Sequence, residues 1–121
     1  SFDCRWIKAY LDLGNNLKYA PTQEWLVTLG AAQLAKLHIK DFVCMSPPEV
    51  LPEKGGKFVP IGQGDIDWVS VRNVIEKIGY SGWVTLEDVR FYTPAEHTQI
   101  LDDFFAGRPM KLAKELRGKK R

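Results

Sequence analysis

The sequence predicts an α/β domain built from about three parallel βα units. Three short apolar segments with strand character, residues 7–13, 34–42 and 82–88, alternate with segments of helical periodicity. Such alternation is typical of βαβ units and a parallel sheet. The chain has 121 residues, of which 45% are hydrophobic and 26% are charged, an ordinary globular composition. We therefore expect residues 1–121 to form a single domain.

The first unit begins with the strand over residues 7–13. Residues 14–16 break this strand, and Pro21 opens a short helix for which Gly30 suits the C-terminal cap. Proline is favoured at the start of a helix, and glycine adopts the left-handed conformation of a cap. The second predicted strand, residues 34–42, follows directly.

A long loop over residues 44–64, which contains four prolines, follows the second strand. Asp65 or Asp67 can cap the next helix, because an aspartate side chain accepts hydrogen bonds from the first helical amides. Gly79 ends this helix, whose apolar positions are Val69, Val71, Val74, Ile75 and Ile78.

The third unit is a strand over residues 82–88 followed by a helix with a clear start signal. Thr93 is the predicted N-cap, Pro94 the first helical residue, and Glu96 completes a capping box. Gly107 ends the helix, whose apolar stripe is Ile100, Leu101, Phe104 and Phe105.

Each predicted strand has one apolar face and one polar face. The polar face ends near the carboxyl end of the strand in Asp12, His38 or Glu87. An open, flavodoxin-like sheet would need both faces apolar, whereas a barrel needs helices on its outside only. The pattern therefore favours part of a barrel. The apolar faces carry Ile7, Ala9, Leu11, Leu37, Ile39, Val84 and Leu86.

Asp12, His38 and Glu87 are the candidate metal ligands. The carboxyl ends of barrel strands meet at one mouth, where active sites of such barrels form. Two carboxylates and an imidazole suit a divalent cation such as Mn²⁺, Co²⁺, Zn²⁺ or Mg²⁺. Each residue also has an ordinary role when taken singly: a helix cap, a hydrogen-bonded packing residue and a solvated carboxylate. Their combination favours metal binding.

Four segments in order resemble the xylose-isomerase-like (AP endonuclease family 2) superfamily, the metal-dependent sugar isomerases and epimerases. Residues 11–15 (LDLGN) are similar to its LD-x-G-H segment, and residues 37–41 (LHIKD) to VH-x-KD. Residues 60–67 match P-x-G-x-GD-x-D, and residues 79–87 match GY-x-G with a terminal LE. The resemblance implies a partial (β/α)8 TIM barrel comprising strands six to eight.

The resemblance also implies roles for individual residues. Asp12 and His38 would be metal ligands, and Glu87 would be both a ligand and one of two catalytic acid/base carboxylates. The metal polarises the sugar carbonyl and hydroxyl. The two carboxylates then remove and return a carbon-bound proton.

Five further residues are candidates for binding substrate. Lys40 and Arg90 are placed to hold a hydroxyl or a phosphate, although each is equally compatible with a solvated surface role. Gly62 and Gly64 would let the backbone approach a phosphate, or serve only as turn glycines. Asn15 replaces the histidine of LD-x-G-H, and an amide can hydrogen-bond a hydroxyl but cannot shuttle a proton near neutral pH.

The chain is expected to be a fragment or a truncated relative. In the resembled family the strands before Ile7 supply the fourth metal ligand, a glutamate that is also the second acid/base. We therefore expect little turnover from the isolated chain. The alternatives are a non-catalytic α/β interaction or remnant module and, less favoured, a relative of the abasic-site endonucleases.

Charge and cysteine content limit the expected partners. The net charge is +2, with six basic residues in the last eleven positions, so residues 109–121 are predicted to be a basic helix or tail. No other groove-reading element marks a nucleic-acid partner. Two cysteines without CxxC spacing and the lack of a long apolar run predict a cytoplasmic protein without a membrane partner. Exposed sheet edges predict a homo-oligomer, and the substrate of the complete barrel would be a sugar or sugar phosphate.

Overall fold

A three-stranded parallel sheet forms the centre of the molecule. The computed structural model describes residues 5–44, 55–87 and 91–110. In chain order the elements are β1 (Ala9–Asp12), α1 (Leu13–Asn16), α2 (Thr22–Gln33), β2 (Leu34–Ile39), β3 (Asp41–Cys44), β4 (Gly56–Val59), α3 (Trp68–Ile78), β5 (Trp83–Leu86) and α4 (Pro94–Phe105).

The sheet has the strand order β1-β2-β5, and both pairings are parallel. Asp12 is level with His38, and Ile39 with Leu86. The amide of Glu87 continues the ladder by donating to the carbonyl of Ile39 at 3.1 Å. The prediction of three parallel strands is therefore confirmed, and the strands end at a common edge.

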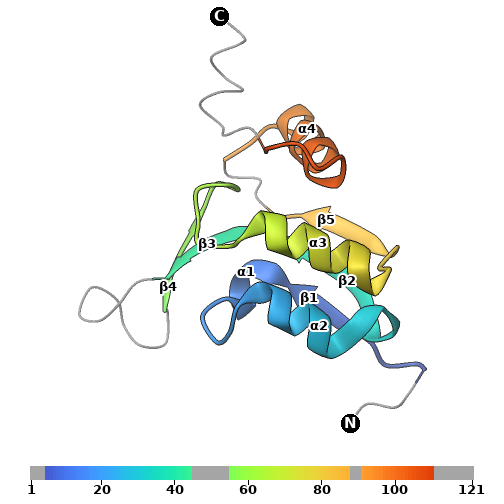
Figure 1. The fold of residues 1–121 in the computed structure, drawn as a ribbon. Helices are drawn as coiled ribbons and strands as arrows, with labels where there is room; N and C mark the ends of the chain where they lie inside the picture. The colour runs from blue at the N-terminus through green and yellow to red at the C-terminus, as the bar shows by residue number, and fades with distance from the viewer. Residues whose placement is uncertain (1–4, 45–54, 88–90, 111–121) are drawn as a thin grey trace, which may run out of the picture.

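Helices α2 and α3 lie side by side over one face of this sheet (Figure 1). The strand side chains that point towards them, Leu37 and Ile39, are at most 1% exposed. From the helices, Leu26, Val71 and Ile75 pack into the same core. Full burial of each such side chain contributes roughly 1.5–3 kcal/mol. The predicted apolar strand face is thus the face that the helices cover.

The first strand is shorter than predicted, and Ile7 lies outside it. Ile7 is 54% exposed, so it does not belong to the buried face. Two helical residues of the predicted apolar sets are also exposed, Val69 (71%) and Phe105 (46%). The sequence pattern shows which positions are apolar, but it does not show which of them another element covers.

The second predicted strand is two separate strands. β2 ends at Ile39, and β3 leaves the parallel sheet to form an antiparallel hairpin with β4. The predictions of one strand over residues 34–42 and of a loop over residues 44–64 were therefore wrong at this point. The run has continuous strand propensity, and only its hydrogen-bond partners decide that it divides. The rings of Phe42 and Phe58 pack edge to face across the hairpin, with their centres 5.2 Å apart.

The helix ends follow the sequence signals. Asp67 caps α3 by accepting from the amide of Ser70, and Gly79 ends it in the left-handed conformation with φ 70°. The capping box of Thr93 and Glu96 is present at α4. In α2, Gly30 interrupts the helix with φ 68°, and a further turn follows it. These predictions are confirmed because caps depend on neighbouring residues alone. The expected helix after residue 109 lies almost wholly outside the described residues.

Among the described residues, none of the helices is both long and apolar enough to cross a membrane.

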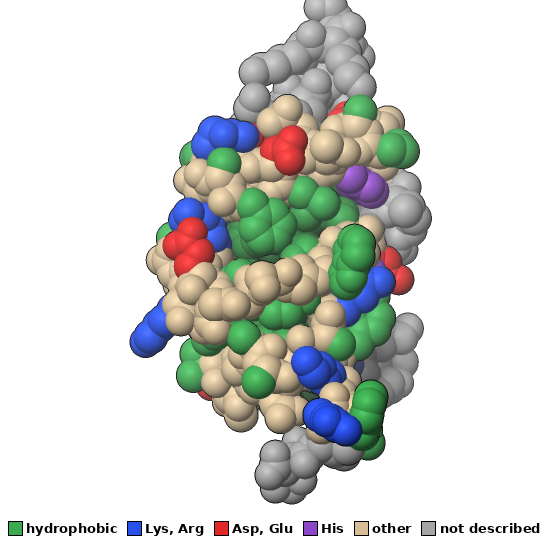
Figure 2. All heavy atoms as spheres, turned by 90° about the vertical axis from the view of Figure 1, so that its right-hand side faces the viewer, with side chains coloured by type: hydrophobic (Ala, Val, Ile, Leu, Met, Phe, Trp, Pro, Cys, Tyr) green, Lys and Arg blue, Asp and Glu red, His purple; other side chains and the backbone are tan. Residues whose placement is uncertain are grey.

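Self-association of the 121-residue chain is one expectation that the sheet supports. Within the described residues β1 and β5 each pair with β2 only, so each has an unpaired edge. Hydrophobic side chains also reach the surface on the side of the molecule seen in Figure 2, and Trp83 of β5 is 79% exposed. Unpaired edges and exposed apolar surface recruit other chains.

We expect a dimer at micromolar concentration in sedimentation velocity or light scattering, burying about 1,200 Å² or more in total. Trp83→Lys should weaken it, because a charge on an edge strand opposes pairing. Val69→Lys is the matched control, since Val69 is similarly exposed at 71% but lies on α3. A strictly monomeric wild-type chain would contradict this expectation.

Candidate metal centre at the carboxyl ends of the strands

Asp12, His38 and Glu87 come together at the edge where the parallel strands end. Nδ1 of His38 lies 3.8 Å from Oδ2 of Asp12 and 3.4 Å from Oε2 of Glu87. One ligand atom from each residue falls within 4.8 Å of the others. The predicted convergence is confirmed. Their role as ligands remains a prediction.

The donor set of this cluster suits a divalent cation. Two carboxylates and an imidazole are the ligands that Mn²⁺, Co²⁺ and Zn²⁺ accept, and carboxylates also suit Mg²⁺. The side chains of Asp12 and His38 are each 17% exposed, and that of Glu87 is 52% exposed. The cluster is therefore partly shielded on the side of β1 and β2 and open on the side of β5. Three protein ligands leave coordination positions for further donors or substrate.

Asp12 serves two purposes at the end of β1. Its Oδ1 accepts the amide of Asn15 at 2.9 Å and so caps the short helix α1. This leaves Oδ2 for the cluster. Asp12 can therefore cap α1 with one oxygen and still offer the other oxygen as a metal ligand. Asn15 itself is exposed beside it.

Lys40 also belongs to the cluster. Its Nζ lies 3.0 Å from Oδ2 of Asp12 and 3.0 Å from Oε2 of Glu87. Burial by itself would lower the pKa of Lys40, but the hydrogen bonds to both carboxylates outweigh it and raise the pKa. The bond from Lys40 in turn holds the pKa of Glu87 below its ordinary value, with a further contribution from His38. Glu87 is thereby kept in the ionised form that a ligand needs.

Tyr10 is a member of the cluster that sequence reasoning missed. Its hydroxyl lies 2.9 Å from Nδ1 of His38, and the two rings are 5.4 Å apart. The contact helps to orient the imidazole. Strand alternation provided a signal, because Tyr10 shares the polar face with Asp12, but nothing in the sequence paired it with His38.

Gly62 and Gly64 lie in a different environment. Their amides donate to Oδ2 of Asp41 at 2.9 and 3.0 Å. A Cβ on Gly64 would fall 2.1 Å from Oδ1 of the same carboxylate. The two amides thus have an internal acceptor, which favours the turn alternative for these glycines over phosphate binding. Arg90 lies outside the described residues.

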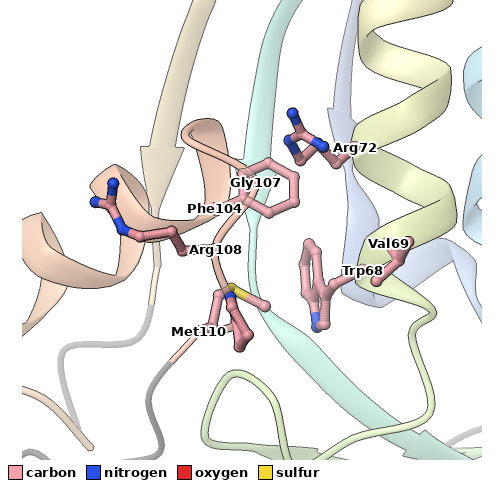
Figure 3. Close-up of a pocket in the computed structure, with 8 residues that line it drawn as sticks. Trp68, Val69, Arg72, Phe104, Gly107, Arg108 and Met110 are labelled. Atoms are coloured by element: carbon pink, nitrogen blue, oxygen red, sulfur yellow. The ribbon is translucent and has the colours of Figure 1, made fainter.

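A separate cavity of about 210 Å³ lies between α3 and the end of α4. Figure 3 shows Trp68, Arg72 and Phe104 around it. Arg72 donates to Glu76 at 2.8 Å, and Trp68 meets Phe104 edge to face. None of the predicted site residues among those described lines this cavity, so it is distinct from the cluster.

Comparison with known proteins agrees with the fold. Residues 1–104 match the family described as the xylose isomerase-like TIM barrel. The chain belongs to this family.

Two curated relatives carry the provisional name L-ribulose-5-phosphate 3-epimerase SgbU. The protein from Haemophilus influenzae is 31% identical over 83 residues, and that from Escherichia coli K12 is 29% identical over 84 residues. Each match covers 68% of this chain and 28% of the relative. The chain therefore spans little more than a quarter of the length of these relatives.

A crystal structure of a xylose isomerase domain protein from Planctomyces limnophilus has a similar fold. It superposes with a TM-score of 0.56 over 92% of this chain and 36% of that protein, at 23% sequence identity. This likeness supports an α/β fold with a parallel, TIM-barrel-like sheet.

Proposed function

We propose that the chain provides a part of a divalent-metal-dependent sugar or sugar-phosphate isomerase or epimerase. In this proposal Asp12, His38 and Glu87 are metal ligands. The observation that carries the proposal is their convergence at the carboxyl ends of three parallel strands. In a (β/α)8 barrel, catalytic residues come from the ends of several strands at that same face.

The chemistry we propose is proton transfer at a carbon next to a carbonyl. The metal supplies polarisation of the substrate carbonyl and hydroxyl, which makes the neighbouring C–H more acidic. The carboxylate of Glu87 takes the proton from carbon, and a second carboxylate on the other face returns one. The Tyr10 hydroxyl contacts Nδ1 of His38, the nitrogen that faces both carboxylates, and this contact would be broken when a metal binds that nitrogen. The second carboxylate and a fourth ligand would come from outside the described cluster.

The substrate we propose is a pentulose 5-phosphate or a similar sugar phosphate, by analogy with the name that the two relatives carry. Lys40 presents a cation at the cluster, and Asn15 lies beside Asp12 with its side chain exposed. Both are suited to binding substrate oxygens. Arg90 remains a candidate from the sequence, while Gly62 and Gly64 are better explained by their bonds to Asp41.

Metal titration of single variants tests the ligand assignment. Wild-type protein should bind Mn²⁺ in isothermal titration calorimetry with release of protons, because ligands must be deprotonated. His38→Ala should weaken Mn²⁺ binding by at least about tenfold to a hundredfold, since even residues that only support a ligand contribute that much.

The chain offers a matched control for this titration. It has two histidines, and the second, His97, lies on α4 next to Tyr92 rather than in the cluster. His97→Ala should leave the Mn²⁺ affinity unchanged. A wild-type chain that binds no divalent metal would favour the non-catalytic module, and equal losses in both variants would argue against His38 as a ligand.

A further inference from the structure

The ammonium of Lys40 is bonded to the same two oxygens that face His38. Oδ2 of Asp12 and Oε2 of Glu87 each lie 3.0 Å from Nζ of Lys40. The other oxygen of Asp12 already accepts the amide of Asn15. Oδ2 of Asp12, which Lys40 already contacts, is therefore the oxygen that a metal would also use.

Lys40 is held in this position by its surroundings. Its side chain is only 15% exposed, and its Nζ lies 4.2 Å from the centre of the Phe58 ring. Its stem runs against Gly14, where a Cβ would meet Cγ of Lys40 at 2.9 Å and the Lys40 carbonyl oxygen at 3.0 Å. The local packing of α1 and of the β3–β4 hairpin thus places the ammonium between the carboxylates.

We propose that Lys40 is a tethered cation that competes with a divalent metal for Asp12 and Glu87, and so sets the apparent metal affinity of the site. The inference rests on the proposed function. Two cations cannot approach the same pair of oxygens without strong repulsion, so a metal ligated by both carboxylates requires the ammonium to withdraw. The flexible four-carbon stem of lysine allows that movement.

Competition of this kind has a defined thermodynamic consequence. The measured dissociation constant equals the intrinsic constant divided by the fraction of molecules in which the carboxylates are available to the metal. Removal of the competing cation therefore tightens metal binding. If Lys40 instead supported the metal, its removal would weaken binding, and if it were only a surface residue the affinity would change little.

Calorimetric titration of Lys40→Met with Mn²⁺ tests the proposal. Methionine keeps most of the stem and removes the charge. We expect the variant to bind Mn²⁺ about tenfold or more tightly than the wild type, because charge-assisted hydrogen bonds to both carboxylates no longer have to be broken.

Lys36→Met is the matched control. Lys36 lies on β2, the strand that leads to Lys40, and its Nζ is 5.0 Å from the Tyr10 ring centre. The control variant loses the same charge near the cluster, so it reports the general electrostatic effect. We expect it to change the Mn²⁺ affinity by no more than about twofold to threefold, as for a screened charge without direct contact.

The outcomes separate the two proposals. Equal Mn²⁺ affinities for the wild type and Lys40→Met, or weaker binding by the variant, would overturn the role of Lys40 and leave the metal site standing. An absence of binding by both proteins would overturn both proposals.

A second measurement avoids dependence on the folding of the variant. In wild-type protein, acetylation of Lys40 by an amine-reactive reagent is followed by peptide mass spectrometry with and without saturating Mn²⁺. Displacement of the ammonium predicts faster acetylation of Lys40 with Mn²⁺, while exposed Lys77 at the end of α3 reacts at an unchanged rate. Unchanged or slower acetylation of Lys40 at saturating metal would overturn the proposal.

Discussion

Asp41→Ala is expected to lower the free energy of unfolding by about 4 kcal/mol or more, because it leaves several buried or half-buried donors without an acceptor. The Asp41 side chain is completely buried. Its Oδ2 accepts from the amides of Gly62 and Gly64 and from the indole of Trp68 at 2.9–3.0 Å. Its Oδ1 accepts the amide of Phe42. One carboxylate therefore shapes the loop that leads into α3.

Urea denaturation followed by circular dichroism measures this effect. Asp65→Ala is the matched control, since Asp65 lies in the same loop, is exposed and accepts the amide of Cys44 at 2.7 Å. We expect the control variant to lose only about 1 kcal/mol of its free energy of unfolding. The loss of stability in Asp41→Asn should lie between those of Asp65→Ala and Asp41→Ala. The amide oxygen of the asparagine can still accept from the three donors that now bond Oδ2. A loss for Asp41→Ala no larger than that for Asp65→Ala would show that water replaces the carboxylate.

The second large effect concerns turnover by the 121-residue chain alone. We expect its rate of pentulose 5-phosphate epimerisation with Mn²⁺ to be lower than that of a complete barrel by about 10²–10⁴-fold or more, since the loss of one acid/base group has that cost. In the described cluster, Glu87 is the residue that we propose as an acid/base. The match to the Haemophilus influenzae relative covers 28% of that relative's length. The fourth ligand that we propose lies outside the described cluster, so metal binding by the chain alone should be weaker as well.

Incorporation of deuterium from D₂O at the epimerised carbon, followed by NMR, is the sensitive assay for this step. Glu87→Gln provides the control for contamination: any exchange that originates in this site should disappear in that variant. Robust epimerisation by the wild-type chain alone would show that both acid/base groups lie within these 121 residues.

The elements that the sequence predicted well are those set by near neighbours. The caps of α3 and α4 depend on Asp67 and on the pair Thr93 and Glu96, which bond within three residues along the chain. The strand alternation separated a covered face from a polar face and so identified Asp12 and His38 as residues of one edge. Parallel strands bring their carboxyl ends to the same side of a sheet, so the convergence of the cluster could be predicted without coordinates.

The tertiary structure decided what depends on partners that are distant in sequence. Asp41 lies within the apparent second strand, yet its side chain bonds amides 21 and 23 residues away, and the chain divides there into β2 and β3. Lys40 shares the polar face of that strand with His38, but only the distances to Asp12 and Glu87 show its ammonium between them. Residue type and spacing encode which side of a strand a group occupies. They do not encode which group on another strand it meets, because that pairing is selected by the free energy of the whole packed structure.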